Sequence, residues 1–259
     1  MDWNKMLYAE NEKPLERLID GYSFTSIFRK IAFVGDSMSS GEFEEVDKNG
    51  NRHNYDMYDY SWGQFIARKN GLTAYNFSRG GMTAKEYIDS FAEANGFWDK
   101  EKVCQAYVVA LGANDIINQN MNPGNDEDMI NYNTTTYIGA YSEIIRRYKE
   151  ISPDAKFFLM TLPKDEKFGN EESYLTINKA INSLVTYFEN TYIIDLYKFA
   201  PIFDAEFRKK YFLYGHMNAM GYIRIAEMVD SYIDYIIRNN MDDFFNVPFI
   251  NFDNKANLL

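Results

Sequence analysis

The sequence predicts an α/β protein in which a parallel sheet of five strands lies between two layers of helices, a three-layer α/β/α sandwich. Five short apolar runs rich in β-branched and aromatic residues are separated by segments long enough to hold a helix. The runs are continuously apolar rather than alternating, which is typical of strands buried on both faces. Strands of this kind that alternate with helices form parallel sheets covered on both sides.

The predicted strands and helices follow one another along the whole chain. The strands are the apolar runs at residues 31–34, 74–77, 107–111, 157–161 and 192–195. Helical periodicity predicts helices over residues 62–69, 84–94, 136–150, 174–188 and 219–238. Apolar residues form one face of the last helix, so we expect it to pack on the sheet.

The chain is expected to form one domain over residues 1–259, with N- and C-terminal extensions packed on it. The sequence contains no internal repeat and no linker rich in Pro, Gly or Ser, and its 46% hydrophobic content fills a sizeable core. Two long stretches without regular periodicity, residues 39–60 and 116–135, each follow a predicted strand. We expect both to be irregular segments that overhang the ends of the strands.

The composition excludes several classes of partner. A net charge of −11, from 38 acidic and 27 basic residues, repels phosphate backbones and anionic membranes, so we expect neither nucleic acid nor a membrane as a partner. No apolar run approaches a membrane span, and residues 1–30 hold no stretch of signal-peptide length. The lone Cys104 and two histidines make an internal disulfide impossible and a structural zinc site improbable, so we expect a cytoplasmic protein.

The first motif carries a candidate nucleophile. Gly35, Asp36 and Ser37 directly follow the first predicted strand, where glycine permits a sharp exit that points a side chain into a cleft. A serine hydroxyl is a common nucleophile in acyl transfer, so Ser37 is the candidate catalytic residue. A helix N-cap is the alternative role for this serine, and Asp36 is expected to fix the turn rather than act in chemistry.

Two further motifs offer hydrogen-bond donors at the ends of the second and third strands. Backbone amides and asparagine side chains stabilise an oxyanion, so Gly81, with Gly80 as its alternative, and Asn114 are candidate donors. Asp115 is expected to cap the turn that follows it. Ligands bind beyond the carboxyl ends of parallel strands, where Ser37, Gly81 and Asn114 all lie.

A candidate general base lies just before the last predicted helix. His216 is followed by Asn218 and Gly221, and its imidazole can take a proton from a serine hydroxyl. The other histidine, His53, lies in a polar segment, where we expect it to be solvated. Ser37 and His216 therefore form the candidate catalytic pair.

The order of these pieces resembles that of the SGNH hydrolases, also called the GDSL family of esterases and lipases, over residues 30–236. That family carries its nucleophile in Gly-Asp-Ser, an oxyanion glycine, an asparagine in Gly-x-Asn-Asp and a histidine in His-x-Asn-x-x-Gly. The resemblance implies the SGNH hydrolase fold with a flavodoxin-like five-stranded sheet, and Ser37 and His216 as catalytic residues. It also implies an oxyanion hole made of the Ser37 and Gly81 backbone amides and the Asn114 side chain, with no cofactor and no metal.

The chain departs from the family pattern at one position. An aspartate usually stands three residues before the histidine and orients the imidazole, but Leu213 occupies that position and residues 210–215 contain no acid. We expect a backbone carbonyl near Leu213 to orient His216 instead. The alternatives are a remote carboxylate, such as Asp195, Asp204 or Glu206, and a catalytically silent site.

The sequence thus predicts a serine esterase that removes a short acyl group, acetyl first, from a small-molecule ester, with acylated sugars among the candidate substrates. Aromatic side chains at Tyr55, Tyr58, Tyr60 and Trp62 offer faces suited to sugar rings, although packing onto the domain explains them more simply. The alternative function is a noncatalytic binding module that has lost the acid of its triad. A flavodoxin-like nucleotide binder is disfavoured by the acidic balance and the lack of a glycine-rich phosphate loop. The sequence makes no prediction of oligomeric state.

Overall fold

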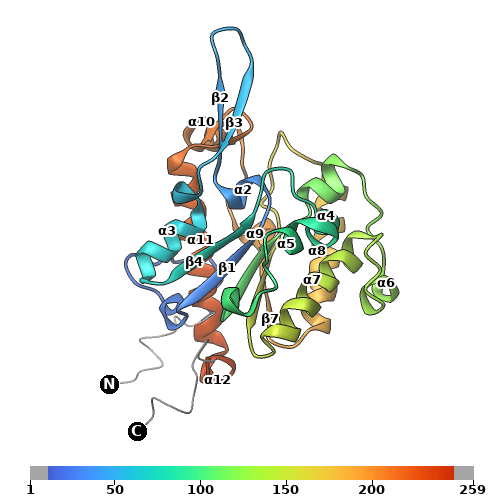
Figure 1. Cartoon of the computed structure of the whole chain (residues 1–259). Coiled ribbons are helices and arrows are strands. Elements are labelled where there is room, and N and C mark those ends of the chain that lie inside the picture. The colour runs from blue at the N-terminus through green and yellow to red at the C-terminus, as the bar shows by residue number, and fades with distance from the viewer. Residues whose placement is uncertain (1–10, 248–259) are drawn as a thin grey trace.

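The computed structural model describes residues 11–247 and shows the predicted three-layer architecture (Figure 1). Five parallel strands form the central sheet in the order β4-β1-β5-β6-β7. They are β1 (Lys30–Gly35), β4 (Thr73–Ser78), β5 (Ala106–Ala110), β6 (Lys156–Met160) and β7 (Thr191–Ile194). Each strand overlaps one of the five apolar runs, so the fold class and the strands are confirmed.

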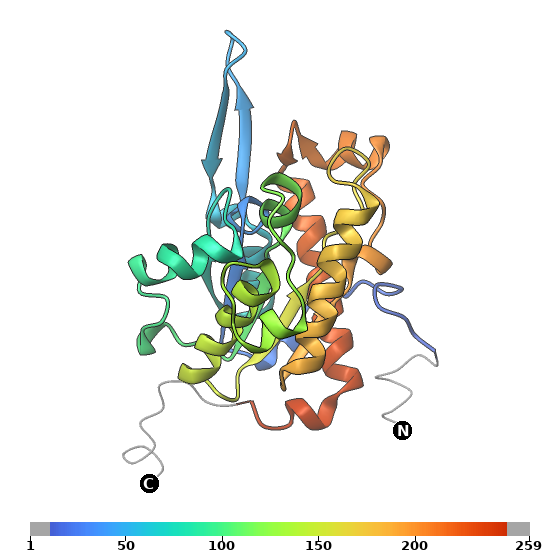
Figure 2. The same cartoon turned by 90° about the vertical axis from the view of Figure 1, so that its right-hand side faces the viewer.

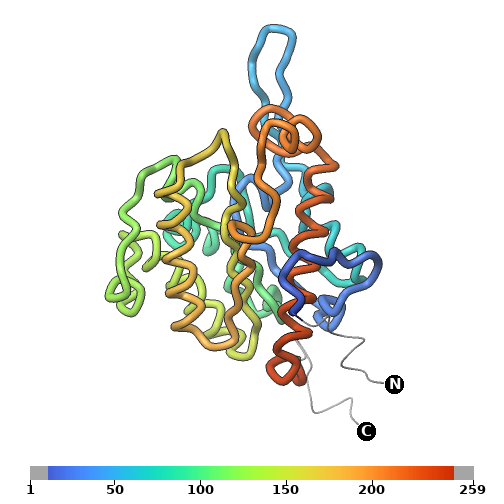
Figure 3. The backbone as a smooth tube through the Cα atoms, turned by 180° about the vertical axis from the view of Figure 1, so that it is seen from behind, coloured from blue at the N-terminus to red at the C-terminus, as the bar shows by residue number. Residues whose placement is uncertain are grey.

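Helices cover both faces of the sheet (Figures 1 and 3). One layer contains α4 (Ala84–Glu86), η3 (Tyr87–Phe91), α5 (Ala92–Ala94), α7 (Tyr137–Ile151) and α8 (Glu171–Tyr187), and the other contains α3 (Trp62–Asn70) and α11 (Ala219–Asn239). Within β1, Val34 packs into the first layer and Phe33 into the second, because successive side chains of a strand point to opposite faces. All five predicted helices are present, and the one at residues 84–94 contains a π-helical turn, η3.

Shorter helices occupy the connections. They are η1 (Phe24–Ile27), η2 (Tyr58–Tyr60), η4 (Lys100–Lys102), η5 (Ala113–Asn118), α6 (Asp126–Ile130), α9 (Leu196–Phe199), α10 (Ala205–Tyr211) and α12 (Met241–Phe244). Two of them, η5 and α6, lie in the loop after β5, so residues 116–135 are less irregular than expected.

Residues 39–60, which we expected to be irregular, form a β-hairpin. One helical turn, α2 (Ser37–Ser40), leads into the antiparallel strands β2 (Glu42–Val46) and β3 (Arg52–Asp56). The hairpin projects beyond the end of the sheet where β1 leads into α2 (Figures 1 and 2). Its strands are polar and β3 is exposed along its whole length, so no apolar run marks the hairpin in the sequence.

The described part of the N-terminal extension lies against α11 (Figure 3). The Ile19 amide donates to the Ser231 hydroxyl at 2.8 Å, and the Arg238 guanidinium pairs with Glu12 at 2.9 Å. Residues 1–10 and 248–259, which include most of the predicted C-terminal extension, lie outside the described residues.

Candidate active site

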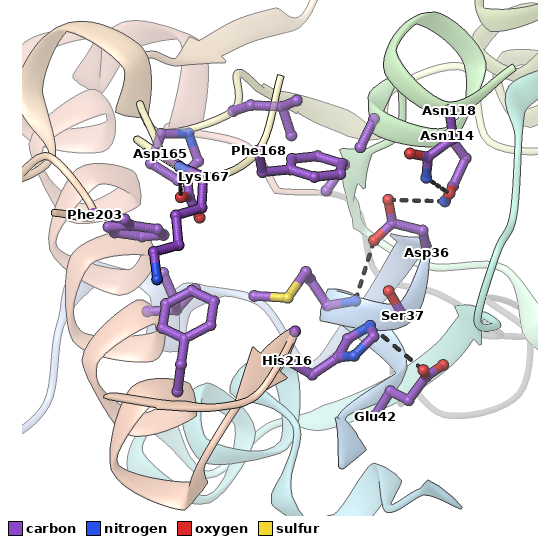
Figure 4. A pocket seen from close by; sticks show the side chains of 18 of the residues that line it. Asp36, Ser37, Glu42, Asn114, Asn118, Asp165, Lys167, Phe168, Phe203 and His216 are labelled. Atoms are coloured by element: carbon purple, nitrogen blue, oxygen red, sulfur yellow. Dashed lines mark hydrogen bonds and ion pairs between the residues drawn. The ribbon is translucent and has the colours of Figure 1, made fainter. Parts of the chain in front are cut away.

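The ends of three neighbouring strands bring the predicted residues to one pocket. Ser37 follows β1, Gly81 follows β4 and Asn114 follows β5, and β1 lies between the other two strands in the sheet. These residues and His216 line a cavity of about 540 Å³ (Figure 4). Residues from four separate sequence motifs therefore meet around one space.

Ser37 is the first residue of α2, so its backbone amide belongs to the open N-terminal end of that turn. The carboxylate of Asp36 accepts the Met38 amide at 3.1 Å and caps the turn, as predicted. A Cβ at Gly35 would lie 2.2 Å from the Ser39 hydroxyl oxygen, so this sharp exit from β1 requires glycine. Burial raises the pKa of Asp36 to about 6. The N-cap is thus Asp36, and Ser37 is placed at the pocket.

Gly81 and Asn114 offer donors to the same pocket. Gly81 has φ +73°, a conformation that favours glycine, and a Cβ there would meet no atom within 4 Å. The Asn114 side-chain oxygen accepts from Asn118 at 2.7 Å, which fixes the orientation of its amide. The Asn114 Nδ2 therefore faces the Met82 carbonyl oxygen at 3.2 Å and the Asp36 carboxylate at 3.4 Å (Figure 4).

Asp115 has a different role from the one predicted. It does not cap the turn that follows it; its Oδ1 accepts the backbone N–H of Ala84 at 2.9 Å, at the start of α4. This bond ties the loop that carries Asn114 to the loop that carries Gly81. The side chain is fully buried, and burial raises the pKa of Asp115 to about 7.

Asp115→Asn is expected to make stability less dependent on pH. Because the pKa of Asp115 is raised in the folded protein, its contribution to stability is fully present below the ordinary carboxyl pKa and is lost as the pH rises to about 7. Between pH 5 and pH 8, the wild type should lose about 2 kcal/mol more free energy of unfolding than the variant, as measured by urea unfolding. An equal loss in both proteins would contradict the raised pKa.

His216 lies in a short hairpin immediately before α11. The hairpin pairs β8 (Phe212–Leu213) with β9 (His216–Met217). Asn218 caps α11 by accepting the Gly221 amide at 2.9 Å, and a Cβ at Gly221 would lie 2.3 Å from the Tyr211 carbonyl oxygen. The residues of the His-x-Asn-x-x-Gly pattern thus fix the start of α11 and hold His216 at the pocket.

A carboxylate from the β2–β3 hairpin faces Nδ1 of the His216 imidazole. Oε2 of Glu44 lies 3.3 Å from Nδ1 of His216 and accepts the Gly215 amide at 2.8 Å, while its Oε1 lies 3.0 Å from Arg52. The Glu44 side chain is 3% exposed. Burial acts to raise the pKa of Glu44, but the hydrogen bonds from Gly215 and His216 and the charge of Arg52 outweigh it and hold this pKa below its usual range. Glu44 is therefore ionised at neutral pH.

The expectation of a backbone carbonyl near Leu213 was wrong, because the group that faces Nδ1 is the carboxylate of Glu44. The three remote acids named from the sequence have other roles. Asp195 caps α9, Asp204 caps α10, and Glu206 forms an exposed ion pair with Lys210. Glu44 stands 172 positions before His216 in a segment without apolar periodicity, so no local signal in the sequence pointed to it.

A second carboxylate lies beside the other ring nitrogen. Oε1 of Glu42 is 3.4 Å from Nε2 of His216 (Figure 4). Burial raises the pKa of Glu42, and the nearby charges of Asp56 and Glu44 raise it further, against the opposing effect of His216. The imidazole thus lies between two acids from alternate positions of β2. Ser37 lies beside His216 and Glu42 in the pocket (Figure 4).

The other candidates named from the sequence do not join the reacting groups. His53 is exposed on β3, with Nε2 3.4 Å from Asp47, as expected for a solvated histidine. Trp62 lies at the wall of the pocket but is buried, with its ring in edge contact with Phe33 at 4.8 Å. The Tyr58 hydroxyl is also buried. Packing onto the domain therefore explains these two rings.

Three further observations concern metal ions, membrane-spanning helices and the cysteine. Among residues 11–247, no group of three or more His, Cys, Asp or Glu side chains is arranged to hold a metal ion. Over the same residues, every helix is too short or too polar to cross a membrane. Cys104 is buried, and burial raises the pKa of its thiol.

The model of the family of GDSL-like lipases and acylhydrolases matches residues 31–229, a range that contains Ser37, Gly81, Asn114 and His216. No curated protein matches the chain.

Several solved structures share the fold. A protein from Lactobacillus plantarum is 16% identical with a TM-score of 0.60, over 80% of this chain and 97% of its own. A family two carbohydrate esterase from Clostridium thermocellum, solved in complex with cellohexaose, is 19% identical with a TM-score of 0.56, over 91% of this chain and 67% of its own. A possible lipase from Chitinophaga pinensis is 17% identical with a TM-score of 0.51, over 81% of this chain and 98% of its own. At these identities the likeness establishes the fold.

Proposed function

Because the chain belongs to the family of GDSL-like lipases and acylhydrolases, we propose that it is a serine esterase that removes a short acyl group, acetyl first, from a small-molecule ester. The observation that carries the proposal is the convergence of Ser37, Asn114 and His216 on one pocket, with Glu44 behind the imidazole. A hydroxyl, a base, an acid and amide donors are the parts that acyl transfer requires.

In the proposed mechanism, Ser37 Oγ attacks the ester carbonyl carbon while Nε2 of His216 takes the hydroxyl proton. The carbonyl oxygen becomes an oxyanion that accepts hydrogen bonds from the Ser37 and Gly81 backbone amides and from Nδ2 of Asn114. When the tetrahedral intermediate collapses, the C–O bond to the alcohol breaks and His216 protonates the departing oxygen. Water then attacks the acyl-serine by the same route and releases the carboxylic acid and Ser37.

Glu44 is proposed as the residue that positions the base. Its carboxylate accepts Nδ1–H of His216, which leaves Nε2 as the atom that takes the proton. Its negative charge also stabilises the imidazolium that forms during each proton transfer. Glu44 thus takes the part that the family usually gives to the aspartate at the position of Leu213.

A noncatalytic binding module is the alternative function. The argument for it was the lack of an acid that could orient His216. Leu213 favoured that alternative because the triad lacked an acid, and Glu44 now provides a carboxylate at Nδ1. A fluorophosphonate probe separates the two functions, because it reacts with activated serine nucleophiles. One covalent adduct on Ser37, located by mass spectrometry, supports the esterase; a folded protein that forms no adduct supports the binding module.

We expect acetyl esters to be hydrolysed faster than long-chain esters. A net charge of −11 keeps the protein from anionic lipid surfaces, where long acyl chains gather. The measurement is kcat/KM for p-nitrophenyl esters from acetyl to octanoyl. Rates that climb towards octanoyl would contradict the acetyl preference and indicate a lipase.

Sugar acetates are the alternative class of substrate, because a carbohydrate esterase shares the fold. The cytoplasm is the proposed location because the chain carries one cysteine, a buried thiol.

A further inference from the structure

We propose that the deep part of the cavity binds the alcohol portion of the ester, and that this alcohol carries a bulky apolar group, preferably an aromatic ring. The inference rests on the proposed esterase function and names its substrate class. It follows from the size of the cavity, the chemistry of its walls and the place of His216 in it.

The cavity is much larger than an acetyl group needs. Its volume of about 540 Å³ lies in the range of sites that bury whole small molecules. A short acyl ester that fills this space must therefore fill it with its alcohol portion.

The deep part of the cavity, which we call the chamber, has mostly apolar walls. They are formed by the side chains of Met160, Leu162, Leu196, Phe203, Phe212 and Ile225. The Phe203 and Phe212 rings lie 5.7 Å apart in an edge-to-face arrangement, so an aromatic surface is built into the cavity. A ring that enters this space would exchange water for apolar and aromatic contacts.

Two polar groups of this region, the Arg208 guanidinium and the Tyr174 hydroxyl, already have partners within the protein. The Arg208 guanidinium pairs with Asp165, donates to the Tyr214 carbonyl oxygen at 3.1 Å and lies over the Phe212 ring at 4.1 Å. The Tyr174 hydroxyl accepts the Asp165 amide at 3.1 Å. The hydroxyls of a sugar would find these groups occupied, whereas a hydrocarbon ring needs no such partners.

The position of His216 indicates that the chamber binds the alcohol portion of the ester. His216 must protonate the departing alcohol oxygen, so the alcohol leaves on the side of the imidazole. Phe212 lies in the same hairpin as His216, paired with Met217, and so forms a wall of the chamber next to the base. In Figure 4, Phe203 lies across the pocket from Asn114, and His216 lies below them beside Ser37. Lys167 extends its amine into the pocket from an exposed position in the loop after β6.

Two isomeric esters test the assignment without any mutation. 2-Phenylethyl acetate carries its ring on the alcohol, and ethyl phenylacetate carries the same ring on the acyl group. We expect kcat/KM for 2-phenylethyl acetate, measured by pH-stat and divided by the rate constant for hydroxide hydrolysis, to exceed that for ethyl acetate by about tenfold or more. We also expect it to exceed the corrected values for ethyl phenylacetate and for a sugar acetate.

A variant locates the preference in the chamber. Phe212→Ala is expected to lower the ratio of kcat/KM for 2-phenylethyl acetate over ethyl acetate by about tenfold, because the ring loses one wall. The ratio, rather than either rate, is compared, since the substitution also adjoins the hairpin of His216. Phe245→Ala is the matched control, because Phe245 is 84% exposed and lies outside the cavity, and it should keep the wild-type ratio.

The outcomes separate this inference from the proposed function. Hydrolysis of ethyl acetate that depends on Ser37, without a preference for 2-phenylethyl acetate, overturns the alcohol chamber and leaves the esterase in place. A preference for ethyl phenylacetate assigns the chamber to the acyl group and overturns the inference, as does a preference for the sugar acetate. Failure to hydrolyse any of the esters overturns the esterase and the inference together.

Discussion

Ser37→Ala is expected to lower kcat for p-nitrophenyl acetate by at least about 10³-fold without changing the fold. In the proposed mechanism this hydroxyl forms the covalent bond to the acyl group, so its removal abolishes the acyl-enzyme route. The oxyanion donors remain in the variant, so a residual rate above that of the buffer is consistent with the mechanism. Initial rates, together with thermal unfolding to verify the fold, measure the effect.

The matched control is Ser90→Ala, which removes a hydroxyl from an exposed position outside the cavity. It should keep the wild-type kcat and the fluorophosphonate adduct, whereas Ser37→Ala should lose both. If Ser37→Ala hydrolyses the ester as fast as the wild type, Ser37 is not the nucleophile.

The fold was predictable because its main elements carry strong local patterns. The five sheet strands are short apolar runs with both faces covered, and the long helices such as α7 and α11 have one apolar face. The motifs that end β1, β4 and β5 were also readable, since each places a glycine or an amide where the chain leaves a buried strand. Their meeting at one pocket follows from the parallel order of these three strands.

The β2–β3 hairpin was not predictable in this way. Its strands carry Glu42, Glu44 and Arg52 in place of apolar residues, and β3 is exposed on both faces. The pairing of such strands depends on backbone hydrogen bonds and tertiary contacts rather than on a buried apolar face. One of these contacts is the bond between the Gly215 amide and Glu44.

The missing acid could not be found from the sequence for the same reason. The family aspartate lies close to its histidine in the chain, so the sequence pointed to the residues just before His216 and to acids near the fifth strand. In the structure, the carboxylate that faces the imidazole is Glu44 of β2. The Arg52 side chain of β3 pairs with Glu44 and balances its charge. A triad depends on geometry around the imidazole and not on the order of its members in the chain.

Glu44→Gln is expected to lower kcat by roughly 10²- to 10⁴-fold with little change in KM. Glutamine has nearly the same shape, and its oxygen can still accept the Gly215 amide. It lacks the negative charge that stabilises the imidazolium formed during each proton transfer. Because the pKa of Glu44 is held below its usual range, the carboxylate is ionised throughout the neutral range, and the defect should persist across it.

Arg52→Gln is the control for the ion pair. It removes the cation beside Glu44 but leaves the carboxylate at Nδ1, and the Arg52 side chain is 69% exposed, so its reduction in kcat should be much smaller. A kcat for Glu44→Gln equal to that of the wild type would show that Glu44 does not position the base.

Restoring an acid at position 213 gives the strictest test of the role of Glu44. Leu213 stands directly opposite His216 in the β8–β9 pair, where Cβ atoms lie about 4.5 to 5.5 Å apart, so an aspartate there can face the ring. Leu213→Asp in the Glu44→Gln background should therefore raise kcat above that of Glu44→Gln alone, whereas Leu213→Asn in the same background should not, because it brings no charge. A loss in Glu44→Gln that came only from a displaced hairpin would respond equally to both substitutions, since neither one restores β2. Rescue by aspartate alone would thus identify a negative charge at the imidazole as what Glu44 provides.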